Sequence, residues 1–300
     1  MNKRSQALIG PALGVVLIGA AGLAVGIMPA AADECDFLSE KFFTKATLAQ
    51  VKQCLQDGAD VSSRDKNGST PLHFAGGHSL APAVIAALIE AGADVGSQND
   101  FGATPLHATA AFNPDATFVA ALLDAGADIG SHDQAGLTPL HWAAAKNPEP
   151  AVIAALIDAG ADIGSRDNND MTPLHAAATF NQMPNVVAAL LGSGADPNIT
   201  NKDGFTPLHA AAVSNHQPAV ITALIDGGAD INSQTKDGVT TLHWAARFNP
   251  EPAVVASLLD AGANPALTDS EGKTAWDYAQ NNSNLKNTDA YLRLKKSQSQ

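Results

Sequence analysis

The tetrapeptide Thr-Pro-Leu-His recurs every 34 residues, and this spacing restricts the chain to one kind of architecture. Intact copies start at Thr70, Thr104, Thr138, Thr172 and Thr206. Thr240 and Thr274 keep the phase with the degraded copies Thr-Thr-Leu-His and Thr-Ala-Trp-Asp, and Gly-Ala-Asp or Gly-Ala-Asn runs in step from Gly58 to Gly262. Self-similarity at a fixed period means stacked units, each burying its apolar face against its neighbours. We therefore expect one elongated domain.

The residues between two copies of the motif predict a helix, a turn, a second helix and an extended hairpin. In the unit 137–170, Thr138 can cap the first helix, and the proline after it fits a first helical position. Asn147 followed by Pro148 has the same form, so we expect a second helix that is capped by Asn147. Gly160 would end it in a left-handed conformation. The matching cap positions in the other full repeats hold Ser79, Asn113, Asn181, Asn215 and Asn249.

This unit, built on Thr-Pro-Leu-His-x-Ala, resembles the ankyrin repeat family over about residues 36–280. The resemblance implies an all-α solenoid of stacked helix-turn-helix repeats with hairpin loops. The period of 34 exceeds the usual ankyrin period of 33, and the extra residue falls between the two helices. The predicted domains are a signal peptide at 1–32, an N-terminal capping repeat at 33–65, six ankyrin repeats at 66–269, a C-terminal capping repeat at 270–296 and a disordered tail at 297–300.

The N-terminus has the pattern of an export signal. Lys3 and Arg4 precede an uncharged stretch, 7–32, which ends in three alanines, so we predict cleavage after Ala32. The alternative is an uncleaved membrane anchor, because the stretch is long enough to cross a bilayer, although two prolines interrupt it. The residues before Cys35 do not form a lipoprotein acceptor site. We expect the body of the protein to be periplasmic or secreted.

The chain has two cysteines, Cys35 and Cys54, both in the first unit of the mature protein. In an oxidising compartment they can form a disulfide, worth ~3 kcal/mol for a loop of this length. The alternative is a pair of reduced cysteines buried as small apolar residues.

The net charge of the full chain is −13, and removal of residues 1–32, which carry only Lys3 and Arg4, leaves −15. An acidic protein repels phosphate backbones, so nucleic acid is not an expected partner. The same field would steer a basic protein or peptide toward it.

Two ladders of repeated polar residues invite a metal hypothesis. Six histidines recur with the motif: His73, His107, His141, His175, His209 and His243. Packed helices lie ~8–10 Å apart, too far for successive histidines to share one ion. In ankyrin-like proteins this histidine ties the hairpin to the helix by hydrogen bonds. The repeated aspartates, such as Asp128, each supply one carboxylate and are expected to form turns rather than calcium sites. We predict no metal, cofactor or catalytic residue.

The resemblance places the partner-binding surface on the hairpins and on the exposed end of each first helix. The hairpin candidates are Leu137, Met171, Phe205 and Val239, and the helix-end candidates are Phe112, Lys146, Phe180, Arg247 and Phe248. Exposed together, these residues would form an apolar strip with two cations, a common mark of a binding surface. The alternative is that the aromatic residues pack between repeats, as we expect for Trp142 and Trp244. The function predicted is a non-enzymatic protein-binding scaffold outside the cytoplasm, with a membrane-anchored scaffold and a secreted effector that binds host proteins as alternatives.

Overall fold

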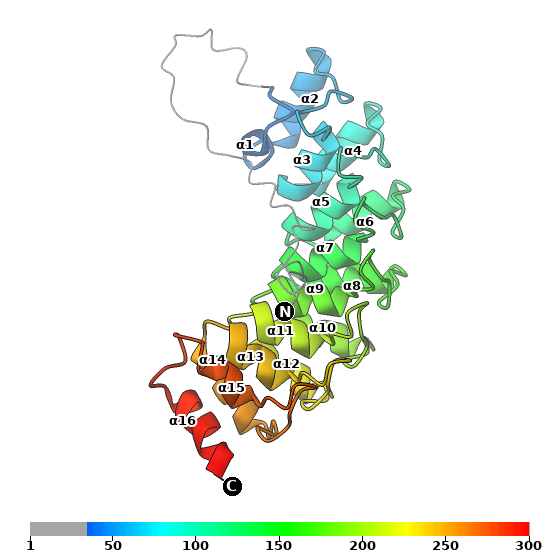
Figure 1. The fold of residues 1–300 in the computed structure, drawn as a ribbon. Coiled ribbons are helices and arrows are strands. Elements are labelled where there is room, and N and C mark those ends of the chain that lie inside the picture. Colours follow the sequence, from blue (N-terminus) through cyan, green and yellow to red (C-terminus); the bar gives the residue numbers. More distant parts are fainter. Residues whose placement is uncertain (1–34, 300) are drawn as a thin grey trace, which may run out of the picture.

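A computed structural model of the chain describes residues 35–299, which form sixteen α-helices in two layers (Figure 1). The inner layer contains α1 (Glu40–Phe43), α3 (Pro71–His78), α5 (Pro105–Phe112), α7 (Pro139–Lys146), α9 (Pro173–Phe180), α11 (Pro207–Ser214), α13 (Thr241–Phe248) and α15 (Ala275–Ala279). The outer layer contains α2 (Leu48–Gln56), α4 (Pro82–Glu90), α6 (Thr117–Asp124), α8 (Pro150–Asp158), α10 (Pro184–Gly192), α12 (Pro218–Asp226), α14 (Pro252–Asp260) and α16 (Asp289–Lys296). Each helix packs against the helix two places before and after it, so the predicted all-α solenoid is confirmed.

The first helix of each repeat starts as the sequence predicts. The Thr138 hydroxyl accepts a hydrogen bond from the backbone N–H of His141, and His141 Nδ1 accepts one from the backbone N–H of Thr138, 3.2 Å away. Pro139 occupies the first helical position, where its missing N–H leaves no bond unmade. At the end of the repeat, Gly160 has a φ of 98°, a left-handed conformation that glycine adopts without steric cost.

The second helix starts later than predicted, and the asparagine is not its cap. Helix α8 begins at Pro150, with Glu149 at the N-cap, whereas Asn147 is the C-cap of α7. The prediction was wrong because Pro150, two residues after Pro148, also fits a first helical position, and the helix begins there. The side chain of Asn147 is thereby freed for contacts with the preceding repeat.

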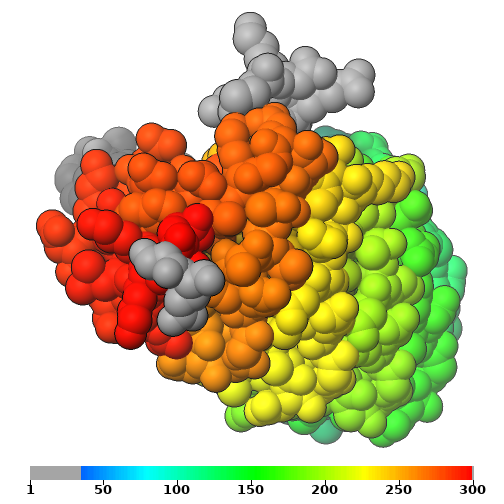
Figure 2. Space-filling model, turned by 60° about the horizontal axis from the view of Figure 1, so that its bottom comes forward, coloured from blue at the N-terminus to red at the C-terminus, as the bar shows by residue number. Residues whose placement is uncertain are grey.

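The core is a continuous layer between the two rows of helices. Val152, Ile153 and Leu156 of α8 are fully buried, as are the equivalent residues of the other complete repeats. Ala143 and Ala144 of α7 are also fully buried, and their small side chains allow neighbouring inner helices to approach closely. In Figure 2 the repeats follow one another as successive slabs toward the C-terminal end, so each unit is covered mainly by its two neighbours.

The two ends of the stack differ from the repeats between them. Cys35 and Cys54 form a disulfide with 5.5 Å between their Cα atoms, so the predicted pairing is present in the structure, next to the short helix α1. At the other end, α16 packs on α14 and α15, and a 3-10 helix (Ser297–Ser299) continues it where we expected a disordered tail. The predicted signal peptide and its cleavage site lie outside the described residues. Within residues 35–299, no helix is long and apolar enough to cross a bilayer.

Candidate functional site

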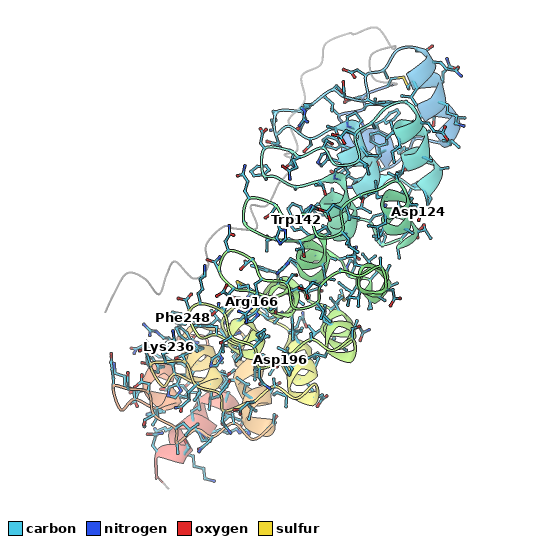
Figure 3. The ribbon with its side chains drawn as sticks, turned by 90° about the vertical axis from the view of Figure 1, so that its right-hand side faces the viewer. Asp124, Trp142, Arg166, Asp196, Lys236 and Phe248 are labelled. Atoms are coloured by element: carbon cyan, nitrogen blue, oxygen red, sulfur yellow. A yellow bond between two sulfur atoms is a disulfide. The ribbon has the colours of Figure 1, made fainter. Side chains whose placement is uncertain are left out.

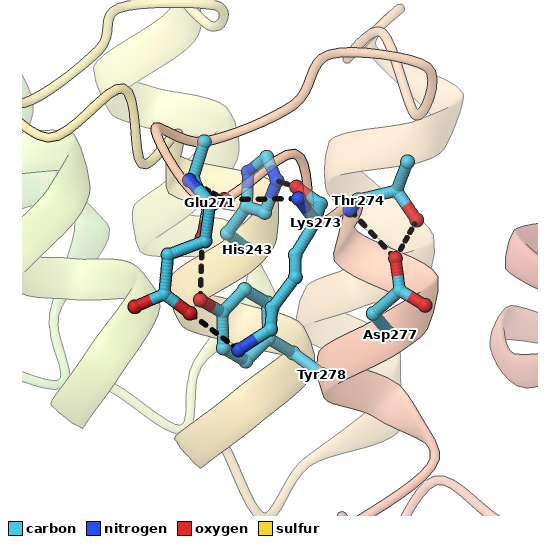
Figure 4. Close-up of polar contacts among 7 residues, drawn as sticks. His243, Glu271, Lys273, Thr274, Asp277 and Tyr278 are labelled. Atoms are coloured by element: carbon cyan, nitrogen blue, oxygen red, sulfur yellow. Dashed lines mark hydrogen bonds and ion pairs between the residues drawn. The ribbon is translucent and has the colours of Figure 1, made fainter. Parts of the chain in front are cut away.

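The repeated histidines join successive repeats. In the second repeat, His107 Nδ1 accepts a hydrogen bond from the backbone N–H of Thr104, so the ring proton lies on Nε2, which donates to the carbonyl of Leu137 in the next hairpin at 3.0 Å. His243 makes the same contact to the carbonyl of Lys273, and Asp277 takes the place of the histidine in the last unit (Figure 4). The predicted hydrogen-bonding role is confirmed for five of the six histidines, whereas His209 accepts from the backbone N–H of Thr206 but its Nε2 is buried without a partner.

Burial keeps the histidine ladder neutral. It lowers the pKa of His107, His175 and His209 to about 4, against the partial opposition of backbone acceptors such as the Leu137 carbonyl at His107. Burial also lowers the pKa of His73, His141 and His243. Within residues 35–299, no group of three or more His, Cys, Asp or Glu side chains is arranged to hold a metal ion.

The repeated aspartates form turns. Asp128 Oδ1 accepts a hydrogen bond from the backbone N–H of Gly130 at 2.9 Å, and Asp94 and Asp162 make the same contact in their own repeats. Each therefore stabilises the turn that follows an outer helix, as predicted.

A ladder of buried asparagines was not foreseen. Asn147 Nδ2 donates to the carbonyl of Ala110 at 2.9 Å and to that of Asn113 at 2.7 Å, both in the preceding repeat. Its equivalents make the same paired contacts: Asn113, Asn181, Asn215, Asn249 and Asn282. These residues lie where the 34-residue repeat carries its extra position, so the amides join consecutive inter-helix loops.

The three helix-end phenylalanines lie at the surface. The exposed fractions are 48% for Phe112, 38% for Phe180 and 41% for Phe248, at the C-terminal ends of α5, α9 and α13. The ammonium of Lys146 lies 5.9 Å from the centre of the Phe180 ring, and Arg247 lies 4.7 Å from that of Phe248. The alternative that these aromatic side chains are buried between repeats is therefore not what the structure shows.

The hairpin half of the predicted strip is largely covered. Leu137 is only 5% exposed and Phe205 8%, while Met171 and Val239 are half-buried. The prediction of an exposed strip is wrong for Leu137 and Phe205, whose side chains are buried in the stack, although their carbonyls make the same histidine contact as that of the half-buried Met171. The Phe205 ring also packs against Trp244, with 4.9 Å between ring centres.

Other apolar residues are exposed that the sequence did not single out. Phe101 is exposed in a hairpin turn, two residues before Ala103, the residue equivalent to the hairpin candidate Leu137. Leu80 and Met183 are exposed in loops between inner and outer helices. Phe101 stands directly before a hairpin glycine, which is the local signal that could have placed it at a tip.

In the complete repeats, basic side chains are confined to one side of the stack, whereas acidic side chains occur on both, since the hairpins also carry aspartates such as Asp133 and Asp237. Helices α4, α6, α8, α10, α12 and α14 and the Gly-Ala-Asp or Gly-Ala-Asn turns after them carry acidic side chains and no lysine or arginine. The basic residues of the repeats lie in the hairpins or, as with Lys146 and Arg247, at the ends of inner helices. In Figure 3, Arg166, Lys236 and Phe248 lie along the left-hand side of the stack, while Asp124 lies on the opposite side.

Comparison with protein families gives one result. A family model described as ankyrin repeats (3 copies) matches residues 77–167, 108–201, 143–231, 174–269 and 212–292. These matches overlap and together cover more than half of the chain. Comparison with curated proteins finds no match. Proteins with such repeats are generally non-enzymatic binding scaffolds, and the matches indicate no catalytic family.

Proposed function

The chain belongs to the ankyrin repeat family, whose repeats mediate protein–protein interactions, and we propose that it captures another protein outside the cytoplasm, on the face formed by its inner helices and hairpins. In this proposal the repeats form a rigid, non-enzymatic support, and the side chains that vary between repeats make the contacts.

The observation that carries the proposal is the row of exposed aromatic residues Phe112, Phe180 and Phe248. They occupy the same position of every second repeat, on inner helices that are otherwise rich in alanine. Packing between repeats does not require them, because Lys146 and Ser214 stand at this position in the repeats between. Aromatic residues, phenylalanine included, and arginine are enriched in protein interfaces relative to the rest of the surface.

The size of this row suits a protein partner. Neighbouring helices pack ~8–10 Å apart, so a row that reaches from α5 to α13 extends over roughly 30–40 Å. A standard interface buries ~800 Å² on each partner, and a row of this length can supply its apolar centre. We expect an elongated contact rather than a single deep pocket.

The location outside the cytoplasm rests on the sequence of 1–32 and agrees with the Cys35–Cys54 disulfide, because disulfides persist mainly in oxidising compartments. The periplasm is the compartment we propose. N-terminal sequencing of the mature protein tests this: a chain that starts at Asp33 supports cleavage, and an intact N-terminus in the membrane fraction favours the anchored alternative. Recovery from the culture medium favours the secreted effector.

The charge of the protein would act mainly during approach. The acidic side chains of the outer helices and their turns lie in the other layer, and the hairpins add further aspartates, so the protein as a whole would attract a basic partner at long range. Such steering makes the association rate fall as salt is added.

The experiment is capture from the periplasmic fraction with the mature chain, followed by mass spectrometry. We expect F112A/F180A/F248A to lose the partner that the wild type captures, with the far-ultraviolet circular dichroism spectrum unchanged. L292A is the control, because Leu292 is an exposed apolar side chain on α16, outside the inner row. Equal capture by the triple variant and the wild type would disprove the proposal.

A further inference from the structure

We propose that Arg247 anchors a carboxylate-binding subsite at the C-terminal end of α13, which takes an Asp or Glu side chain of the partner protein with an apolar side chain beside it. This inference rests on the proposed function and adds the chemistry of one contact. The nearby cation–aromatic cluster consists of Trp244, Arg247, Phe248, Lys273 and Tyr278.

Arg247 differs from the other arginines of the described chain. Arg64 donates from Nη1 to the carbonyls of Gly68 and Gln98, and Arg166 to those of Asp170 and Thr200, so both tie one hairpin to the next. Arg293 pairs with Asp260. Within residues 35–299, Arg247 makes no side-chain hydrogen bond and no ion pair.

The guanidinium of Arg247 is nevertheless held in place. It lies 4.7 Å from the centre of the Phe248 ring and 5.2 Å from that of Tyr278, and the residue is half-buried. Aromatic contacts of this kind stabilise the planar cation through its faces and leave the N–H groups at its edge available. An edge with two parallel donors matches the two oxygens of a carboxylate, and charge-assisted bonds of this form are about twice as strong as neutral ones.

The carboxylates nearest this cluster already have partners (Figure 4). Asp269 accepts hydrogen bonds from the Tyr278 hydroxyl and from the backbone N–H groups of Glu271 and Lys273. Asp277 accepts from Thr274, and Glu271 pairs with the ammonium of Lys273. Arg247 and Lys273 both lie within 6 Å of the Tyr278 ring, but Lys273 is paired with Glu271, so Arg247 is the cation of this cluster that is left without an ion pair.

The wall of the subsite is apolar. The exposed Phe248 ring stacks on Trp244 with 5.6 Å between ring centres, and Trp244 packs in turn on Phe205. In the third repeat, Trp142 donates from Nε1 to Asp133 at 2.9 Å. Thr235 stands at the position of that aspartate beside Trp244, whose Nε1 is buried without a hydrogen-bond partner. A carboxylate next to an apolar side chain therefore fits both parts of the cluster, the cation and the aromatic wall.

The position within the repeats also sets Arg247 apart. The matching positions of the other full repeats hold only small or uncharged residues: Gly77, Ala111, Ala145, Thr179 and Val213. A large cation here is therefore not part of the framework that stacks the repeats. The acidic residues of the outer helices lie in the other layer, and at physiological salt charges are screened over about 8 Å. Their repulsion of an acidic segment is accordingly weak at Arg247.

The test uses the mature, disulfide-bonded chain and a library of random 12-residue peptides displayed on phage. We expect the peptides selected on the wild type to be enriched in Asp or Glu next to an apolar residue. A selected peptide is then synthesised with its acidic residue intact and with the corresponding Gln or Asn. We expect a loss of about tenfold in affinity from R247Q, and a similar loss from the peptide change. The two losses should not add, because R247Q removes the group that reads the carboxylate.

K295Q is the control, because Lys295 is an exposed cation on α16, outside the inner row and the subsite, and it should leave affinity within about twofold. R247K keeps the positive charge but lacks the planar guanidinium, so we expect its affinity to lie between those of R247Q and the wild type. The inference would be overturned by selected peptides without acidic enrichment, or by equal peptide affinity of R247Q and the wild type. If F112A/F180A/F248A still abolished binding in that case, the proposed function would stand without the inference. Peptide binding that survives the triple variant as well would remove the proposed function with it.

Discussion

Acid should unfold this protein through its histidine ladder, well above the pH at which carboxylates protonate. In His107, His175 and His209 burial lowers the pKa to about 4, against about 6.5 for an exposed imidazole. The geometry of His175 explains why the charged form is rejected: its Nδ1 accepts from the backbone N–H of Thr172, and its Nε2 lies 2.9 Å from the Phe205 carbonyl. A second ring proton would lie on Nδ1 and point at the backbone N–H of Thr172, which is itself a donor.

The direction and size of the change in stability with pH follow from the difference in proton binding between the folded and unfolded chains. Below pH ~6.5 the unfolded chain binds protons that the folded chain does not, so stability is complete above that pH and is lost as pH falls toward 4. For a pKa of about 4 in the folded state, the free energy of unfolding falls by about 2 kcal/mol per histidine between pH 7 and pH 5. The three histidines together lose roughly 6 kcal/mol, a large share of a typical folding stability. The lowered pKa values of His73, His141 and His243 add to the loss in the same direction.

Urea unfolding followed by circular dichroism at pH 7, 6 and 5 measures this loss. H175Q is the decisive variant, because glutamine can keep the contact to the helix start, as Gln50 does beside Thr47, but cannot titrate. We expect H175Q to cost about 1–2 kcal/mol at pH 7, for the lost contact to the Phe205 carbonyl, and to weaken the pH dependence by about 2 kcal/mol. H132Q, at an exposed histidine, is the control. A pH dependence identical in wild type and H175Q would refute the reasoning.

Three further predictions concern the framework. In G76A the new Cβ would lie 2.2 Å from the Thr109 hydroxyl, so we expect the free energy of unfolding in urea to fall by about 1–3 kcal/mol. G76A/T109A removes both this clash and a buried hydroxyl without a partner, so its free energy of unfolding should exceed that of the wild type by about 1 kcal/mol. An equal cost of G76A with Thr109 and with Ala at position 109 would contradict this. N181A should lose about 3 kcal/mol by the same measurement, since two buried carbonyls of the preceding repeat lose their donor, and a loss below about 0.5 kcal/mol would show that water replaces the amide. C35S/C54S should lose ~3 kcal/mol in urea unfolding, and retained stability would show that the cross-link constrains little.

The sequence predicted the framework well where a residue acts on its own neighbourhood. Thr138, Pro139 and Gly160 do what their chemistry dictates within one turn of helix, so the first helix and the end of the second could be placed. The histidine and aspartate ladders belong to the same class, because their period shows that each repeat uses them alike. The disulfide followed from there being only two cysteines in one unit.

The errors came from residues whose partner lies one repeat away. The side chain of Asn147 could either cap a helix or donate hydrogen bonds as a buried amide. It does the second, because the carbonyls of Ala110 and Asn113 in the preceding repeat accept from it. The period could have indicated this, since an asparagine recurs at the position that makes the repeat 34 residues long. Phe205 is a similar case, because Trp244, which packs against its ring, belongs to the next inner helix.

A repeat protein offers an internal standard for telling framework from function, because each position is present several times in nearly the same surroundings. Arg64 and Arg166 join hairpins, whereas Arg247 has aromatic contacts and unpaired donors. Trp142 has an aspartate acceptor that Trp244 lacks. Both departures lie on α13, on the same helical face and beside the exposed Phe248. The Trp244 Nε1 is buried and closed to a partner, whereas stacking does not require the Arg247 cation, so the unpaired edge of its guanidinium points to a contact that stacking does not supply.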